Sequence, residues 1–130
     1  LVERFLTSLL EENDNDFGWR RLQESISLIN FSKGLVEVEK LAAVACWSRK
    51  QFERNFQALV GTSPKQFMRV VRFQNTLYFR GQNNQLSLTE LAYECGFFDQ
   101  SHMIADFRDL SGKTPGQYFA ECEPVSDYFD

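Results

Sequence analysis

Residues 87–119 read SLTELAYECGFFDQSHMIADFRDLSGKTPGQYF, and the fold is predicted first from this segment. Ser87 stands three residues before Glu90, which is the spacing of a capping box at the start of a helix. Gly96 stands where a left-handed residue would end that helix. The stretch therefore predicts a short helix that stops at a tight turn. Its expected apolar face consists of Leu88, Leu91, Ala92 and Cys95.

A second short helix is predicted after the turn. Asp99 can cap its N-terminus, because an Asp side chain accepts hydrogen bonds from the free N–H groups of a first turn. Met103, Phe107 and Leu110 recur at i, i+4 and i+7, which gives this helix one apolar face. A third helix is expected after Pro115. Two amphipathic helices joined by so tight a turn form a helix-turn-helix.

Length and composition favour one folded domain. The chain has 130 residues, 43% hydrophobic and 15% aromatic, which is enough to bury a core. No apolar run approaches the roughly 18 residues of a membrane span, and no secretory signal is visible. We therefore expect a soluble, cytoplasmic protein with no membrane partner. The chain begins at Leu1 rather than Met, which suggests a fragment of a longer protein.

Cysteine and histidine are too few for the common metal sites. The three cysteines show no CxxC spacing, and the one histidine, His102, cannot complete a zinc finger. The cysteines are expected to act as small hydrophobes in a reducing cytoplasm. No Gly-rich phosphate loop and no Ser/His/Asp or Cys/His pairing is present. We therefore expect neither an enzyme nor a cofactor or metal.

Charge is unevenly distributed along the chain. The net charge is −4, which taken alone disfavours a polyanionic partner. Residues 47–81, however, hold seven Lys or Arg against one Glu, and acidic residues prevail on both sides of this segment. The middle segment therefore predicts one positive face on an otherwise acidic molecule.

Helical patterns also precede the middle segment. Residues 1–13 carry an apolar stripe that would pack on this domain or on a missing partner. Residues 19–31 resume the helical pattern, and Lys33-Gly34 stops it. The stripe in residues 1–13 consists of Val2, Phe5, Leu6, Leu9 and Leu10. The inward side chains of the second pattern are expected to be Leu22, Ile26, Leu28 and Ile29.

A second pair of helices is predicted within residues 37–60, with its turn at Cys46-Trp47. Ser48 and Gln51 repeat the capping-box spacing. Gly61 ends this pair, and Ser63-Pro64 begins a linker helix expected to reach about Arg80. The buried faces of the pair are expected to contain Val38, Leu41, Ala42 and Ala45 before the turn, and Phe52, Phe56, Leu59 and Val60 after it.

The two helix pairs are copies of one unit. Leu41-Ala42 and Cys46 match Leu91-Ala92 and Gly96 at an offset of 50. Beyond the turn the offset is 51, so the second turn is one residue longer. So many matched positions indicate a duplicated helix-turn-helix. The pairs at the larger offset are Phe52 with Met103, Phe56 with Phe107, Gly61 with Gly112, Pro64 with Pro115, and Phe67 with Tyr118.

These residues resemble the DNA-binding domain of AraC/XylS-type bacterial transcription regulators over about residues 37–120. Residues 41–64 match the first, looser unit. Cys46 departs from the family pattern, where the first turn often has Gly, and so does Ala105, where many members carry Arg or another polar residue. The most specific part of the match comprises Leu91-Ala92, Cys95-Gly96-Phe97, Asp99-Gln100-Ser101-His102, Phe107, Gly112 and Thr114-Pro115.

The resemblance implies an all-α fold in which one long helix joins two helix-turn-helix subdomains, with both recognition helices in the major groove on the same side of the duplex. A linker of about 17 residues is roughly 25 Å long. With the subdomain radii added, it would hold the recognition helices about one turn of DNA, roughly 34 Å, apart. The expected segments are N-terminal helices at 1–35, at the junction with a missing effector or dimerisation domain, a first helix-turn-helix at 36–63, a linker helix at 64–81, a second helix-turn-helix at 86–120, and an acidic tail at 121–130.

The exposed face of the first recognition helix is the expected base-reading surface. Lys50 or Arg54 could donate to guanine, Gln51 could pair with adenine, and Glu53 could accept from cytosine. The alternative is a solvated face on which Arg49 and Glu53 pair at i, i+4. The expected DNA-binding residues of this unit are Arg49, Lys50, Gln51, Glu53 and Arg54.

The second recognition helix is expected to contribute less affinity than the first. The second helix presents a face poor in donors and rich in acid, with Asp99, Asp106 and Asp109 counted as exposed. Three roles are considered for His102, namely a surface or capping role, a DNA contact, and catalysis. The expected contacts of this helix are Gln100, Ser101 and His102. The expected phosphate contacts are Lys65, Arg69, Arg72 and Arg108. For the three linker residues among them, the alternative is an ordinary polar helix face.

The function predicted from the sequence is sequence-specific binding of double-stranded DNA by two recognition helices in successive major-groove segments, regulating transcription. The expected partner is a DNA operator. The resemblance also implies contact with RNA polymerase and dimerisation through a missing N-terminal domain. A helical protein-protein interaction module without DNA contact is the alternative. Acidic flanks and the apolar N-terminal stripe would suit such a module, but it leaves the basic segment unexplained.

Overall fold

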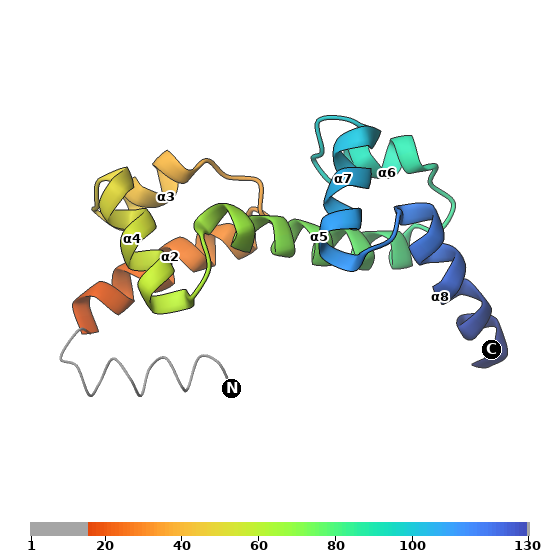
Figure 1. The fold of residues 1–130 in the computed structure, drawn as a ribbon, viewed down its shortest axis with the longest axis horizontal. Helices are drawn as coiled ribbons and strands as arrows, with labels where there is room; N and C mark the ends of the chain where they lie inside the picture. Colours follow the sequence, from red (N-terminus) through yellow and green to blue (C-terminus); the bar gives the residue numbers. More distant parts are fainter. Residues whose placement is uncertain (1–15, 130) are drawn as a thin grey trace. The chain divides into compact units, whose positions relative to one another are not determined.

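The computed structural model describes residues 16–129, and these form seven helices and no strand (Figure 1). The predicted all-α fold is thereby confirmed. The apolar stripe predicted in residues 1–13 lies outside the described residues. The helices are α2 (Asp16–Phe31), α3 (Val38–Val44), α4 (Arg49–Val60), α5 (Pro64–Gln82), α6 (Leu88–Glu94), α7 (Gln100–Ser111) and α8 (Pro115–Phe129).

The chain forms two compact units, and the boundary between them falls inside α5, between Val71 and Arg72. Met68 belongs to the buried core of the first unit, and Val71 packs against that core. Phe73 and Leu77 pack against the core of the second unit. The helix α5 therefore contributes side chains to both cores.

The first unit includes α2 as an integral part. Trp19, Leu22 and Ile29 from α2 are buried together with Leu41 of α3. Ser25 is also buried, and its hydroxyl donates to the Leu41 carbonyl oxygen at 2.9 Å. This bond satisfies a polar group that would otherwise be costly to bury. The side chains of α2 thus share one core with α3 and α4 of the first helix-turn-helix.

The second unit is held by aromatic rings around Phe107. Phe107 is fully buried, and its ring centroid lies 4.7 Å from that of Phe73 and 5.8 Å from that of Phe119. Tyr118 packs on the same cluster, with its ring centroid 6.0 Å from that of Phe107. The last helix, α8, continues to Phe129. Residues 121–129 are thus helical, where the acidic sequence suggested a tail.

The predicted duplication is visible in the caps and turns. Complete capping boxes start α4 at Ser48 and α6 at Ser87. In the second box, the hydrogen bond from the Ser87 backbone N–H lowers the pKa of Glu90. Cys46 and Gly96 occupy equivalent turn positions with φ of 58° and 80°. The conformation of Cys46 explains why the sequence pattern of this family favours glycine there, because a Cβ makes left-handed backbone costly.

Replacing Cys46 with glycine is expected to stabilise the chain by about 0.5–1 kcal/mol. The left-handed φ of 58° strains a residue with a Cβ, and glycine removes this strain at some cost in unfolded-state entropy. Equilibrium urea unfolding of the whole chain measures the difference. Cys46→Val is the matched control and is expected to destabilise, since a β-branched residue fits this conformation poorly. A glycine variant less stable than the parent chain would show that the turn is not strained.

Candidate nucleic-acid interface

The second helix of the first unit, α4, presents a polar face built on a firmly anchored inner face. Its capping box fixes the N-terminus, and Gly61, with φ of 92°, ends it. Phe52 and Phe56 on the inner face are fully buried, and their ring centroids lie 5.6 Å apart. The helix backbone that carries the outer side chains is therefore held in place by the core. The exposed residues of this face include Arg49, Lys50, Glu53, Arg54 and Gln57.

Arg49 lies between two carboxylates. Its Nε donates to Glu53 Oε1 at 3.0 Å, and its Nη1 contacts Glu39 Oε1 from α3. The hydrogen bond to Glu53 and the charge of Glu39 both raise the pKa of Arg49. The i, i+4 pairing of Arg49 with Glu53, which was the alternative to DNA contact, is present. Both side chains thus have partners within the protein before any ligand arrives.

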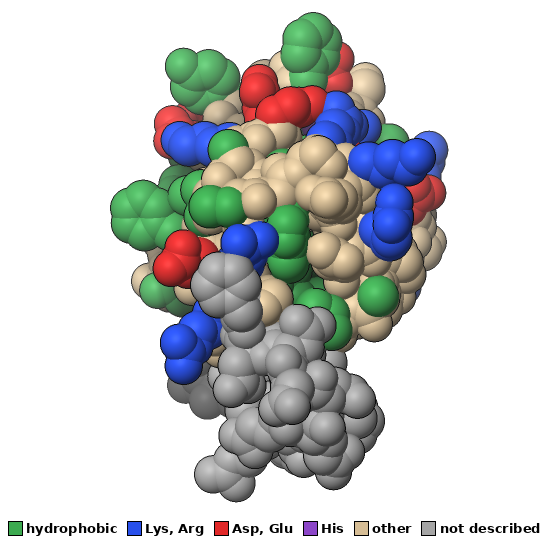
Figure 2. Space-filling view, turned by 90° about the vertical axis from the view of Figure 1, so that its left-hand side faces the viewer, with side chains coloured by type: hydrophobic (Ala, Val, Ile, Leu, Met, Phe, Trp, Pro, Cys, Tyr) green, Lys and Arg blue, Asp and Glu red, His purple; other side chains and the backbone are tan. Residues whose placement is uncertain are grey.

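Lys50 and Arg54 are differently placed. Both are exposed on α4, and neither makes an ion pair with any residue in the part of the chain that the structure describes. Figure 2 shows Lys and Arg side chains lying together on the described surface, with Asp and Glu side chains near some of them. Lys50 and Arg54 are therefore the cations of α4 that remain available to an external anion.

Gln51 serves the helix cap. Its backbone N–H donates to Ser48 Oγ at 3.2 Å, and its Oε1 accepts from the Ser48 backbone N–H at 3.1 Å. Bidentate recognition of adenine uses both the oxygen and the nitrogen of an amide side chain. Because the oxygen already accepts this bond, the cap competes with the base-reading role predicted for Gln51.

The basic residues of α5 separate into two environments. Lys65 is exposed and borders, with Arg49 and Glu39, a shallow hollow of about 440 Å³. Arg69 is half-buried, and its Nη1 donates to Gln66 Oε1 at 2.9 Å. Both residues belong to the first unit.

Arg72 belongs to the second unit, and its position corrects the prediction that it lies on the polar side of the linker helix. Its side chain is only 15% exposed, and its Nη2 lies 3.8 Å from Asp106 Oδ2. Asp106 itself is buried and not exposed as predicted. The exposed face of α7 therefore carries one acid fewer than the sequence suggested. Its helical spacing, three residues after Met103 and four before Leu110, already places Asp106 on the apolar face of α7.

The predicted contact residues of α7 are partly engaged with their own unit. Gln100 Oε1 accepts from Thr89 Oγ1 of α6 at 2.8 Å. The His102 backbone N–H donates to Asp99 Oδ1 at 2.8 Å, and its Nδ1 accepts from the Phe98 N–H at 3.2 Å. The capping role considered for His102 is thus present. Ser101 is exposed at the first turn, and Arg108 is exposed near the C-terminal end.

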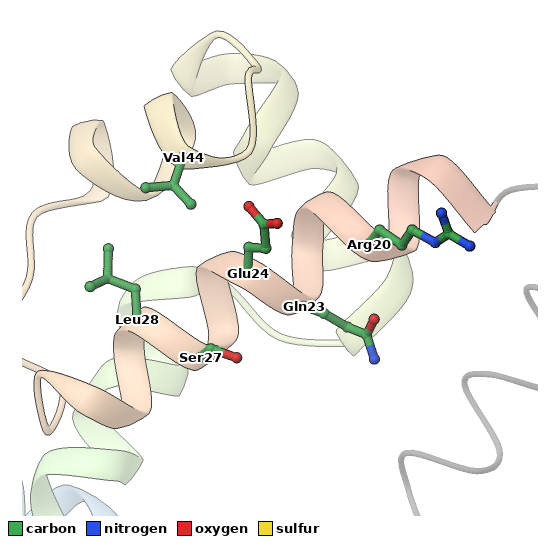
Figure 3. Close-up of a pocket in the computed structure, with 6 residues that line it drawn as sticks. All are labelled: Arg20, Gln23, Glu24, Ser27, Leu28 and Val44. Carbon is green, nitrogen blue, oxygen red and sulfur yellow. The ribbon is translucent and has the colours of Figure 1, made fainter.

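A second, larger hollow lies away from the predicted residues. It has a volume of about 660 Å³ and opens between α2 and α3. Glu24, Leu28 and Val44 point into the space between the two helices, while Arg20 extends along α2 (Figure 3). The other residues at its edge are Gln23 and Ser27. No residue predicted to bind DNA lines it.

Two kinds of site are not found among the described residues. No group of three or more His, Cys, Asp or Glu side chains is placed to hold a metal ion in this part of the chain. Within the same residues, none of the helices combines the length and apolar character needed to cross a membrane.

Sequence comparison identifies the family. A family model described as a helix-turn-helix domain matches residues 41–121, which include α4, α5, α6 and α7. The chain belongs to this AraC-type helix-turn-helix family.

Curated relatives share the matched region. An "Uncharacterized HTH-type transcriptional regulator" of Haemophilus influenzae is 35% identical over 81 residues, covering 62% of this chain and 27% of the relative. "HTH-type transcriptional regulator MtrA" of Neisseria gonorrhoeae is 32% identical over 84 residues, covering 65% of this chain and 28% of the relative. The matched region thus spans about a quarter of the length of these relatives.

Solved structures share the fold. A transcriptional regulator with an AraC-type DNA-binding domain from Chromobacterium violaceum superposes with a TM-score of 0.68 at 24% identity, covering 79% of this chain and 92% of the other. The DNA-binding domain of AdpA, a global transcriptional factor solved in complex with a target DNA, superposes with a TM-score of 0.63 at 30% identity, covering 77% and 90%.

Proposed function

We propose that this chain binds double-stranded DNA sequence-specifically through the outer faces of α4 and α7 and thereby regulates transcription. The observation that carries the proposal is the outer face of α4, where Lys50 and Arg54 are exposed beside a rigidly buried inner face. A capped helix with an exposed basic face is the form in which helix-turn-helix proteins enter the major groove. The resemblance to the AdpA domain, which was solved with its target DNA, supports the same reading.

The proposed DNA contacts of each side chain depend on the partners that it already has within the protein. Arg54 and Lys50 are proposed as the base readers of α4, with guanine O6 and N7 as the acceptors that suit them. Glu53 can accept a hydrogen bond from cytosine N4 only if its carboxylate releases Arg49 or contacts both groups at once. Gln51 chiefly holds the cap. On α7, Ser101 is the proposed contact, and Gln100 and His102 take part only if they release their partners in the second unit.

Phosphate contacts are proposed for the basic residues that are not proposed as base readers. They carry no sequence information but fix the register on the duplex and make binding dependent on salt. Arg72 is left out because it lies inside the second unit. The proposed phosphate contacts are Arg49, Lys65, Arg69 and Arg108.

The chain carries two recognition helices, one in each unit. We expect a single chain to read two adjacent sites, as most helix-turn-helix proteins do only as dimers.

Titration of the chain with duplex DNA at several salt concentrations tests the proposal. The affinity is expected to fall as salt rises, with log K against log salt decreasing by about 0.9 for each phosphate contact. Binding that is absent at low salt, or that ignores salt, would favour the alternative of a protein-interaction module. That alternative gives no reason for the exposed cations of α4.

The Glu39 carboxylate is expected to restrain DNA binding by holding Arg49. Glu39→Gln removes one of the two partners of Arg49, so affinity is expected to rise roughly twofold to fivefold, with a steeper salt dependence. The matched control is Glu37→Gln, which makes the same charge change at an exposed residue whose side chain makes no cap bond. Fluorescence anisotropy with one labelled duplex measures both. Equal gains in the two variants would show that only net charge matters.

We also propose that the chain forms part of a longer cytoplasmic regulator that contacts RNA polymerase and dimerises through a further domain. The support is that the curated relatives are about four times as long as the matched region. Sedimentation of the full-length protein against this chain tests the dimer. A full-length protein that stays monomeric at all concentrations would contradict it.

A further inference from the structure

We propose that Asp106 is a positioning residue that sets the orientation of α7, and thereby decides which bases the outer face of α7 can reach. The inference rests on the proposed function, because it concerns the second of the two recognition helices. Asp106 itself faces inward and is 5% exposed, so it does not contact the duplex.

The first observation is an ion pair inside the second unit. Arg72 of α5 approaches Asp106 of α7, with 3.8 Å between Nη2 and Oδ2, and the two side chains are 15% and 7% exposed. The Arg72 guanidinium also lies over the Phe97 ring, 5.3 Å from its centroid. Breaking a buried pair by removing one partner is costly, since the remaining charge stays buried. The pair therefore ties α7 to one particular position on α5.

The second observation extends this pair to the turn. His102 Nε2 lies 3.8 Å from the same Asp106 oxygen, while His102 Nδ1 accepts from the Phe98 N–H at 3.2 Å. The His102 ring packs edge-on against Phe97 at 5.4 Å between centroids. The Asp106 carboxylate thus lies near Arg72 of α5 and near His102 in the first turn of α7. His102 in turn contacts the residues just before α7. A shift of α7 would disturb all of these contacts together.

The third observation is that α4, the equivalent helix of the first unit, shows no such arrangement with the residues that the structure describes. At the offset of 51 that relates α7 to α4, the equivalent of Asp106 is Asn55, which is half-buried and carries no charge. The equivalent helix α4 is instead anchored by apolar side chains, with Phe52 and Phe56 buried and Leu59 and Val60 packed against the same core. The charged anchor is therefore a particular feature of the second recognition helix and not a general requirement of the duplicated fold.

A matched pair of charge removals separates positioning from simple electrostatics. Asp106→Asn and Asp109→Asn each remove one negative charge from α7, the first from a buried residue and the second from an exposed one. If only charge near the phosphates matters, both variants bind DNA more tightly. If Asp106 positions α7, Asp109→Asn binds more tightly whereas Asp106→Asn binds roughly 2-fold to 30-fold more weakly. A gain in affinity in both variants would overturn the proposal.

A double variant separates positioning from stability. Arg72→Met with Asp106→Leu replaces the pair by apolar side chains, a change that leaves stability equal or higher in many proteins. The variant is expected to stay folded and to lose base discrimination in the half of the site read by α7, while discrimination in the other half is kept. If this variant discriminates as the parent chain does, the pair is merely structural and the proposal is wrong.

Amide NMR shifts without DNA make the test independent of the proposed function. Asp106→Asn is expected to shift the amides throughout α7 and the preceding turn, and Asp109→Asn only those near residue 109. Shifts confined to the substituted position in both variants would contradict the positioning role, even if the parent chain binds DNA normally. Failure of the parent chain to bind DNA would instead contradict the proposed function. In that case, amide shifts throughout α7 in Asp106→Asn would still support the proposal that Asp106 orients α7.

Discussion

Replacing Phe107 with alanine is expected to destabilise the second unit by about 3–5 kcal/mol, the usual range for removing a fully buried aromatic ring. Phe107 packs against Phe73, Tyr118 and Phe119, so the cavity would open at the centre of the second core. Because the two units have separate buried cores, the first unit is expected to keep its stability. The variant should therefore unfold in two steps.

The tryptophans make the two steps separable. The chain has two Trp residues, Trp19 and Trp47, and both pack in the core of the first unit. In urea, tryptophan fluorescence should follow the first unit alone, whereas far-ultraviolet circular dichroism should follow both. Phe56→Ala is the matched control, since Phe56 is equally buried in the first core and should move the fluorescence transition. Coincident shifts of both signals in Phe107→Ala would show that the units unfold as one.

Replacing Arg54 with alanine is expected to weaken DNA binding by about 1–3 kcal/mol if the guanidinium makes a bidentate contact to guanine. Arg54 is exposed on α4, and no ion pair to another described residue has to be broken before it can bind. The loss should be concentrated at one base pair of the site, because a base reader affects specificity as well as affinity. Anisotropy titrations against the preferred duplex and single-base variants measure both effects.

Gln100→Ala is the comparison in the second unit. Gln100 is half-buried, and its Oε1 already accepts from Thr89 Oγ1, so its removal is expected to cost less than the removal of Arg54. A clearly larger loss from Gln100→Ala than from Arg54→Ala would show that the second recognition helix, and not the first, supplies most of the affinity.

Local signals in the sequence predict the helices and turns, and the family resemblance adds the arrangement of two subdomains joined by one long helix. Ser48 with Gln51 and Ser87 with Glu90 identify helix starts, because a capping box depends on residues only three apart. Gly61 and Gly112 identify helix ends, because the left-handed backbone they adopt is costly for other residues. Comparing the two copies of the pattern then revealed the duplication, including the longer second turn.

Tertiary partners were beyond these local signals. Helical spacing shows that α2 has an apolar stripe but not that the stripe packs on α3. Glu39 holds Arg49 from ten residues earlier in the chain, across the turn. Arg72 and Asp106 form a pair although they are 34 positions apart in the sequence. Each side chain, considered without its partner, was therefore predicted to be exposed. Helical periodicity places Asp106 on the apolar face of α7, beside Met103 and Phe107, but it does not identify Arg72 as the partner.

Selection of bound sequences from a random duplex pool measures whether one chain reads two segments of the major groove. We expect the chain to enrich two short blocks of preferred bases, with centres about 10–10.5 base pairs apart. Arg54→Ala is expected to weaken the preference in one block only. Enrichment of a single block, or no enrichment over the starting pool, would contradict the claim that two recognition helices of one chain read successive segments of the major groove.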